Sequence, residues 1–290
     1  MIIFAIMVFL LLPITVSADT GPKPSVNITF ENMGDELCYC TLLSNTDYFG
    51  PYSVWNGDES NITNYNYYNL DKEVWRAFVE YEDTDGYVFL QIGQQVNETK
   101  KFVWGYSPPM SFKILLYYPE TETFLVSGIY ERYAFDTYYT VDMDGVKTDN
   151  VNNNQILQAY KSYNYVKETT ALIARIIITI LIEMGVALLF YFREKKQLIF
   201  IAAVNIVTQI ILNVLLNDIN YNSGLLLFTI SYIFFEIIIF ALEAILYCIV
   251  MNRINKQPKK FRIYVAYSLV ANAVSFITGL IIAYIVPGMF

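Results

Sequence analysis

Four long apolar stretches in the last 120 residues constrain this chain more than any other feature of its sequence. They run approximately over residues 171–192, 198–216, 225–250 and 263–286. Each is close to the length of about 20 residues that a helix needs to cross about 30 Å of hydrocarbon. The sequence therefore predicts four membrane-spanning helices.

Composition divides the chain into two unlike parts. The chain as a whole is 55% hydrophobic and carries a net charge of −8. Residues 19–168 hold 22 acidic and ten basic side chains, whereas residues 169–290 hold five acidic and nine basic ones. An acidic N-terminal part lacks the basic face that binding to phosphates requires, so we exclude nucleic acid as a partner.

The first 18 residues have the pattern of a secretory signal peptide. An apolar run over 2–12 precedes Pro13, and Val16-Ser17-Ala18 is a small-residue cleavage site. The alternative is an uncleaved anchor, but about fifteen apolar residues interrupted by Pro13 are short for a membrane span. We therefore predict a signal peptide over residues 1–18.

Basic residues between the apolar stretches predict the orientation. Arg193, Lys195 and Lys196 follow the first stretch, and five basic residues lie within 253–262, whereas the connection 217–224 has none. Because basic loops remain in the cytoplasm, the segment before the first span is predicted to lie outside the cell. The predicted location is the plasma membrane, with an extracellular N-terminal domain.

Polar residues within the apolar stretches recur at helical spacing, so each predicted helix has one polar side. Four such sides indicate a bundle with a shared polar interior, in which Glu243 is expected to lie on the cytoplasmic side of the centre. The predicted intramembrane cluster comprises Glu183, Asn205, Gln209, Glu236, Glu243, Asn272 and Ser275, with Arg175 and Asn213 toward the outer leaflet.

Two interpretations of this cluster stay open. Amides, hydroxyls and protonated glutamates can hydrogen-bond between helices and fix their packing. Alternatively, Glu183 and Glu236 exchange protons or bind a cation, because a buried membrane carboxyl is costly and is a candidate for function.

The residue inventory argues against an enzyme. The chain has no histidine, which removes His-dependent nucleophile systems and zinc motifs of the His-Glu-x-x-His type. It also lacks a Gly-rich loop of the P-loop or dinucleotide-binding type. We predict neither a catalytic site nor a cofactor.

Residues 19–150 are predicted to form an all-β, sandwich-like domain, followed by a linker and juxtamembrane helix over 151–170. Turn residues separate short strand-like segments that we expect to pair as hairpins. These pairs are 26–30 with 37–43, 75–81 with 87–92, and 111–118 with 124–130.

Two Asp-x-Asp-Gly sequences, at Asp83 and Asp142, suggest calcium loops but lack the EF-hand spacing. We interpret both as turns and predict no metal site. Cys38 and Cys40 lie two apart on one predicted strand, so no structural disulfide is expected.

A segment rich in Tyr and Asn near Trp55 is the candidate external contact surface. Tyrosine offers a large contact area and a hydrogen-bonding tip, which suits recognition loops. The candidate residues are Trp55, Tyr65, Tyr67 and Tyr68.

Several segments carry a resemblance to a known family. They are Asp19-Thr20-Gly21-Pro22-Lys23-Pro24-Ser25-Val26, residues 37–44 with Gly50-Pro51-Tyr52-Ser53, and residues 192–243 from Phe192-Arg193-Glu194-Lys195-Lys196-Gln197 through Asn205, Thr208-Gln209 and Asn213 to Glu236 and Glu243. The chain resembles, over nearly its whole length, a family of uncharacterised membrane proteins of Clostridia and related low-GC bacteria. The resemblance implies a bacterial plasma membrane and a Sec-type signal peptide, and it brings no activity.

These expectations describe an α+β membrane protein, with an extracellular β-sandwich-like domain and a four-helix transmembrane domain over 171–290. The favoured function is an accessory or sensor-like component of the cell surface. Its external domain would bind an extracellular ligand or partner, and its bundle would dock to another membrane protein or to a second copy in the lipid bilayer. The alternative is a small cation- or proton-coupled transporter that uses Glu183 and Glu236.

Overall fold

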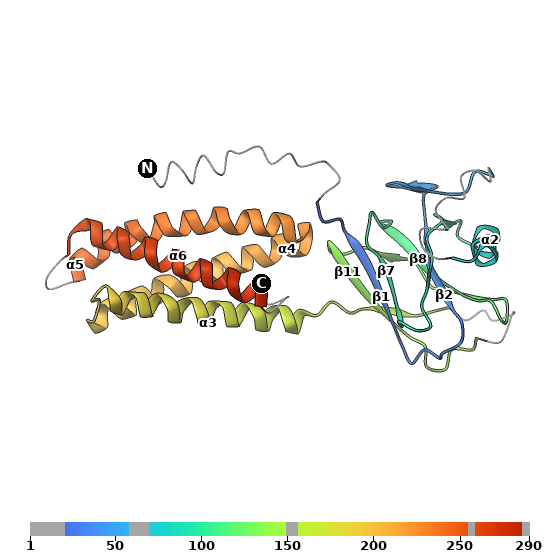
Figure 1. Ribbon diagram of the computed structural model, residues 1–290, viewed down its shortest axis with the longest axis horizontal. Helices are drawn as coiled ribbons and strands as arrows, with labels where there is room; N and C mark the ends of the chain where they lie inside the picture. Colours follow the sequence, from blue (N-terminus) through green and yellow to red (C-terminus); the bar gives the residue numbers. More distant parts are fainter. Residues whose placement is uncertain (1–20, 58–69, 149–155, 255–258, 286–290) are drawn as a thin grey trace.

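The computed structural model describes residues 21–57, 70–148, 156–254 and 259–285. The predicted signal peptide over 1–18 lies outside these residues. The described chain forms a β-sheet domain at one end and a group of long helices at the other, arranged along one axis (Figure 1).

Two sheets form most of the N-terminal domain. In the first sheet the order is β12 (Ala159–Lys161), β11 (Asp136–Asp142), β1 (Ser25–Glu31) and β7 (Lys101–Trp104). In the second, β10 (Tyr130–Glu131), β8 (Ser111–Tyr118), β2 (Tyr39–Ser44) and β5 (Val88–Phe89) follow one another, with β6 (Gln94–Gln95) beside β2 and β9 (Thr123–Val126) beside β8. A separate two-stranded sheet joins β3 (Tyr48–Phe49) and β4 (Tyr52–Ser53).

The two larger sheets enclose one apolar core, as in a β-sandwich. Ile28 and Phe102 from the first sheet belong to the same buried cluster as Leu42 and Leu116 from the second. Alternate residues of β1 are buried, because successive side chains of a strand point to opposite faces. Removing each large apolar side chain from water stabilises the fold by about 1.5–3 kcal/mol.

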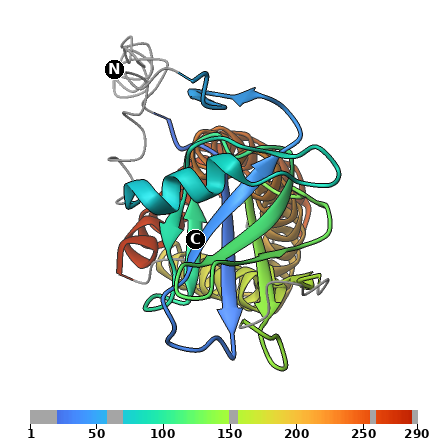
Figure 2. The same cartoon turned by 90° about the vertical axis from the view of Figure 1, so that its right-hand side faces the viewer.

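A third layer covers the outer face of the second sheet. Helix α2 (Lys72–Glu80) lies across that face (Figure 2) and buries Val74, Trp75 and Phe78 against it. The predicted strand over 75–81 is therefore wrong. Its large apolar residues lie on one side of a helix, and its charged residues lie on the other.

The predicted strand pairings are partly correct. Strands β8 and β9 form the expected hairpin, with Leu115 opposite Val126. The expected hairpin of 26–30 with 37–43 is wrong, because β1 pairs with β7 and β11 while β2 belongs to the other sheet. The segment 87–92 likewise pairs with β2 through β5, not with residues 75–81.

The sheet continues into the range predicted as a linker. Strand β12 pairs antiparallel with β11, placing Thr140 opposite Tyr160. Leu157 is also buried in the sandwich core. Only residues 162–164 separate β12 from α3 (Tyr165–Leu189). The Asn164 side chain caps that helix by accepting from the backbone N–H of Lys167 at 2.9 Å.

In the described part of the chain, three helices are long and apolar enough to cross a membrane: Tyr165–Leu189, Lys195–Ile254 and Phe261–Ile282. The second comprises α4 (Lys195–Leu246), a π-helical turn (Tyr247–Met251) and α5 (Asn252–Ile254). The last lies within α6 (Phe261–Ile285).

Helix α4 folds back on itself at Gly224, whose φ of 78° is the one non-helical position inside it. Its first arm (residues 195–223) and its second arm (residues 225–246) lie side by side (Figure 1). The Thr208 hydroxyl donates to Glu243 across the two arms at 3.1 Å. The predicted eight-residue loop over 217–224 is therefore almost entirely helical. A single glycine with positive φ makes the reversal.

Candidate functional site

All nine polar residues predicted for the interior of the helices are buried. Their exposed fractions range from 0% to 9%. They are Glu183, Asn205, Gln209, Glu236, Glu243, Asn272 and Ser275, together with Arg175 and Asn213. Many large apolar side chains of the same helices are exposed instead, as Val166 (77% exposed) and Leu181 (67%) illustrate.

Glu243 joins three helical segments. Its Oε1 accepts from Thr208 on the first arm of α4 at 3.1 Å, and its Oε2 accepts from the Asn272 amide on α6 at 2.7 Å. The bond to Asn272 brings Glu243 into direct contact with another member of the predicted cluster. Thr208 was not among the predicted site residues.

Two tyrosines extend this network to α3. The hydroxyl of Tyr247 donates to Asn205 Oδ1 at 3.3 Å, and its ring lies 5.3 Å from that of Tyr267. The hydroxyl of Tyr267 in turn donates to the backbone carbonyl of Glu183 at 3.3 Å. Sequence reasoning missed Tyr267 because tyrosine is also a common apolar residue of such helices.

Glu183 contrasts with Glu243. It is fully buried, and within the described part of the chain neither carboxyl oxygen has a hydrogen-bond partner. The Asn205 amide and the carboxyls of Glu236 and Glu243 lie close enough to interact with it electrostatically. A charged carboxylate in this position is costly unless a proton or a cation neutralises it.

Glu236 lies beside a groove between the second arm of α4 and α6. The groove encloses about 310 Å³ and is lined mainly by apolar side chains, with Glu236 and Asn272 as its polar residues. Glu236 Oε2 is buried and has no partner among the described residues. The groove therefore gives the polar interior a lateral opening.

The outer end of the cluster is held by an arginine. Arg175 Nη2 donates to Asn217 Oδ1 at 2.8 Å and so joins α3 to the first arm of α4. On that arm the Asn213 amide donates to the carbonyl oxygen of Gln209 at 2.9 Å. This end of the helices lies next to the sheet domain (Figure 1).

The helices and the sheet domain meet through Phe135. Its backbone N–H donates to the carbonyl of Tyr221 at 2.8 Å. A Cβ added at Gly224 would lie 2.5 Å from the Phe135 ring, so only glycine leaves room for this contact. The loop before β11 is therefore locked against the turn of α4.

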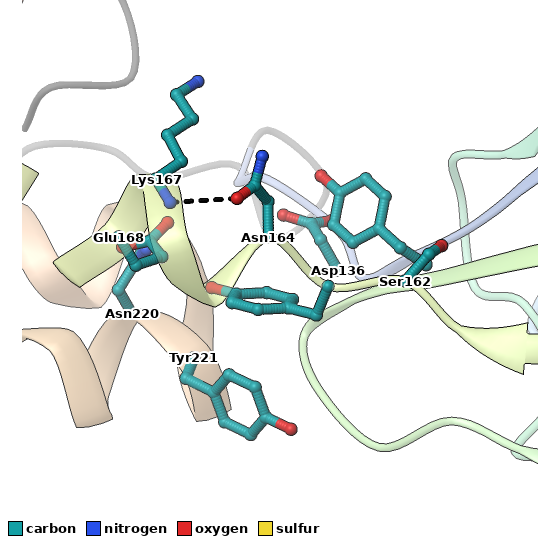
Figure 3. A pocket seen from close by; sticks show the side chains of 9 residues that line it. Asp136, Ser162, Asn164, Lys167, Glu168, Asn220 and Tyr221 are labelled. Atoms are coloured by element: carbon teal, nitrogen blue, oxygen red, sulfur yellow. Dashed lines mark hydrogen bonds between the residues drawn. The ribbon is translucent and has the colours of Figure 1, made fainter. Parts of the chain in front are cut away.

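Tyrosines surround this contact, and a pocket of about 310 Å³ opens beside it (Figure 3). The ring of Tyr163 lies 5.9 Å from Tyr138 and 5.2 Å from Tyr221, and it meets both at steep angles. The remaining lining residues are Asp136, Ser162, Asn164, Lys167, Glu168 and Asn220. Burial, with the neighbouring Glu168 carboxylate, raises the pKa of Tyr163 and keeps its hydroxyl neutral.

Of the four predicted external contact residues, the structure describes Trp55. Trp55 is half-buried and packs edge to face on Trp75 at 5.4 Å between ring centroids, so it holds α2 in place. Tyr65, Tyr67 and Tyr68 lie outside the described residues.

The carboxylates of the turn at Asp83 form ion pairs with a lysine side chain from strand β8. Lys113 Nζ lies 2.8 Å from Asp83 and 2.6 Å from Asp85, which supports the interpretation of this sequence as a turn. Among the described residues, no group of three or more Cys, Asp or Glu is arranged to hold a metal ion. Cys38 and Cys40 are buried free thiols, as expected.

Comparisons with protein-family models, with curated proteins and with solved structures gave no match.

Proposed function

We propose that this chain is a sensor-like or accessory protein of a bacterial cell surface. In this proposal α3, the two arms of α4 and α6 form a four-helix bundle in the plasma membrane, and the sheet domain lies outside the cell. The sheet domain receives a ligand or partner and transmits its state to the helices. The apolar outer faces of the helices dock in the bilayer to another membrane protein or to a second copy.

The contact of Phe135 with the turn of α4 carries this proposal. The peptide chain alone joins β12 to α3, and such a connection could act as a simple tether. The Phe135 bond to Tyr221 and its packing on Gly224 add a second, separate attachment. Two attachments to different helices allow a movement of the sheet domain to change the angle between those helices.

Thermal unfolding with two probes tests the coupling. All three tryptophans lie in the sheet domain, so their fluorescence reports on it, whereas circular dichroism at the helix minimum reports mainly on the helices. We expect the two transitions to coincide in the wild-type protein and to separate in Phe135→Ala. Val103→Ala, at an exposed position of β7, is the matched control and should leave them coincident. Separate transitions in the wild type would refute the coupling.

A second candidate function is proton- or cation-coupled transport, and the unpartnered carboxyl of Glu183 favours it. If Glu183 or Glu236 exchanges a proton or holds a cation, the isosteric amide must abolish flux. The test compares ion flux into liposomes for Glu183→Gln, Glu236→Gln and the exposed control Glu194→Gln. Loss of flux in the first two variants with wild-type melting would establish transport, and absence of flux in the wild type would exclude it.

A further inference from the structure

The pocket beside Phe135 has features that neither coupling nor packing requires. It lies where the sheet domain meets the outer ends of α3 and the first arm of α4 (Figure 3). Its volume of about 310 Å³ is at the lower end of the range for small-molecule sites. Its walls combine tyrosine rings with carboxylates.

The aromatic walls are suited to a cation. The rings of Tyr138, Tyr163 and Tyr221 all line the pocket, and Tyr163 is inclined by 66° to Tyr138 and by 76° to Tyr221, so the three rings face different directions. The face of an aromatic ring attracts an ammonium group, and cages of such rings recognise organic ammonium ions. Burial raises the pKa of Tyr138 as well, so its ring stays a neutral phenol.

A neighbouring tyrosine already binds an ammonium group of the chain itself. Lys161 Nζ lies 4.6 Å from the ring centroid of Tyr133. Tyr133 belongs to the same group of rings, because its centroid lies 6.5 Å from that of Tyr221. Cation binding by tyrosine is therefore an observed interaction at this junction.

The charges of the lining also favour a cation. Asp136 and Glu168 contribute two carboxylates, and Lys167 contributes one ammonium group. The Lys167 side chain extends away from Tyr221 and Asn220 (Figure 3). The N-terminus of α3 would attract an anion, but Asn164 caps it and Glu168 lies in its first turn.

We propose that this pocket binds an organic ammonium group, carried by a free quaternary ammonium compound such as choline or by a lipid headgroup. The carboxylate of Glu168 and the rings of Tyr138, Tyr163 and Tyr221 would hold the cation. The position next to Phe135 makes this pocket a ligand site for the proposed sensor, and in that sense the inference rests on the proposed function. Direct binding tests it independently of the two-probe unfolding experiment.

Calorimetry on the full chain in phosphatidylglycerol nanodiscs provides the test, with choline as the probe. Its neutral isostere 3,3-dimethylbutan-1-ol has the same shape without the charge. We expect saturable binding of choline and at least about tenfold weaker binding of the isostere. Equal binding of the two, or no binding of choline, would overturn the proposal.

Three variants assign the binding to this pocket. Glu168→Gln should weaken choline binding about tenfold, whereas Tyr160→Phe on β12, whose hydroxyl bonds to Glu31 outside the pocket, should leave it unchanged. Lys167→Gln should strengthen binding by removing a like charge, which a misfolded protein could not do. Unchanged affinity in both Glu168→Gln and Lys167→Gln would contradict the assignment.

Repeating the titration in a second lipid shows whether the ammonium group comes from a lipid headgroup or from a free compound. In phosphatidylcholine nanodiscs, a site that takes the lipid headgroup will bind added choline more weakly, because the headgroup competes. A site for a free quaternary ammonium compound will bind choline as tightly as in phosphatidylglycerol. Either result is consistent with an ammonium site and identifies the ligand class more closely.

Discussion

Asp83 in the sheet domain and Glu183 in the helices are both buried acids, but within the described residues only Asp83 has a cation beside it. The side chain of Asp83 is 1% exposed and forms an ion pair with Lys113. Glu183 is fully buried near the carboxyls of Glu236 and Glu243 and the amide of Asn205. A lysine of the chain therefore neutralises the buried acid of the sheet domain, whereas no Lys or Arg of the described residues forms an ion pair with Glu183.

The sheet domain and the helices also differ in which side chains they bury and which they expose. The sheet domain turns its apolar side chains inward, as Ile28 and Leu42 show. The helices bury Asn205 and Glu243 and expose residues such as Leu181. Each part is therefore arranged for a different solvent, water for the first and, in the proposed placement, lipid for the second.

The largest effect is expected where the sheet domain would lose its internal cation. Lys113→Met leaves the buried Asp83 carboxylate with backbone N–H donors from Asp85 and Tyr87 but without its cation, and should lower the free energy of unfolding by about 3–5 kcal/mol. Denaturant titration followed by tryptophan fluorescence measures it. The exposed pair of Lys100 with Asp35 provides the control, and Lys100→Met should change little. Equal losses in the two variants would show that Lys113 is not the neutralising group.

The next largest effect is expected at the boundary between the two parts. Gly224→Ala introduces a side chain at positive φ and against the Phe135 ring, so it should destabilise the protein by about 1–3 kcal/mol. Gly105→Ala is the matched control, because an added Cβ there meets nothing within 4 Å. Melting followed by circular dichroism compares them, and equal melting temperatures would disprove the close contact.

A smaller effect should separate the two helix glutamates. Glu243→Leu removes an acceptor from Thr208 and Asn272 and should cost about 1 kcal/mol, close to the usual range for membrane hydrogen bonds. Glu183→Leu removes a carboxyl that makes no hydrogen bond within the described part of the chain, so its melting temperature in detergent should equal or exceed the wild-type value. The reverse order would mean that Glu183 has an essential bonding role.

The last effect depends on pH and concerns the Cys38 thiol of the sheet domain. Burial raises the pKa of Cys38 to about 12, so the folded state holds its proton more tightly than the unfolded chain. This contribution to stability is complete below the unfolded pKa of about 8.5 and is lost as the pH rises toward about 12. Between pH 8 and 10, Cys38→Ala should therefore lose less stability than the wild type. Identical pH profiles would refute the shift.

The helix interior could be predicted from the sequence because polar residues stand out in an apolar background. At 100° per residue, Glu236 and Glu243 already share one side of their helix, and a single periodicity is enough to place them. The partners of Glu243 could not be predicted in this way. They depend on how far each helix slides along its neighbour, which local spacing does not specify.

The sheet domain shows where local patterns mislead. Strand β1 pairs in parallel with β11, so Ser25 lies opposite Asp136, and no turn signal records a pairing between such distant residues. Helix α2 was mistaken for a strand because it is short and contains Val74, Trp75 and Phe78, which favour strands. The turn at Gly224 was predicted as a long loop because residues 217–223 are largely polar.

Cysteine labelling in intact cells tests the central claim, that the sheet domain and the helices face different solvents with the sheet domain outside. Asp35, Asn222 and Lys195 are exposed positions for single cysteines, and the wild-type chain with its buried thiols gives the background. A membrane-impermeant maleimide should label Asp35→Cys and Asn222→Cys in intact cells, and Lys195→Cys only after permeabilisation. Labelling of Lys195→Cys in intact cells, with Asn222→Cys protected, would contradict the account.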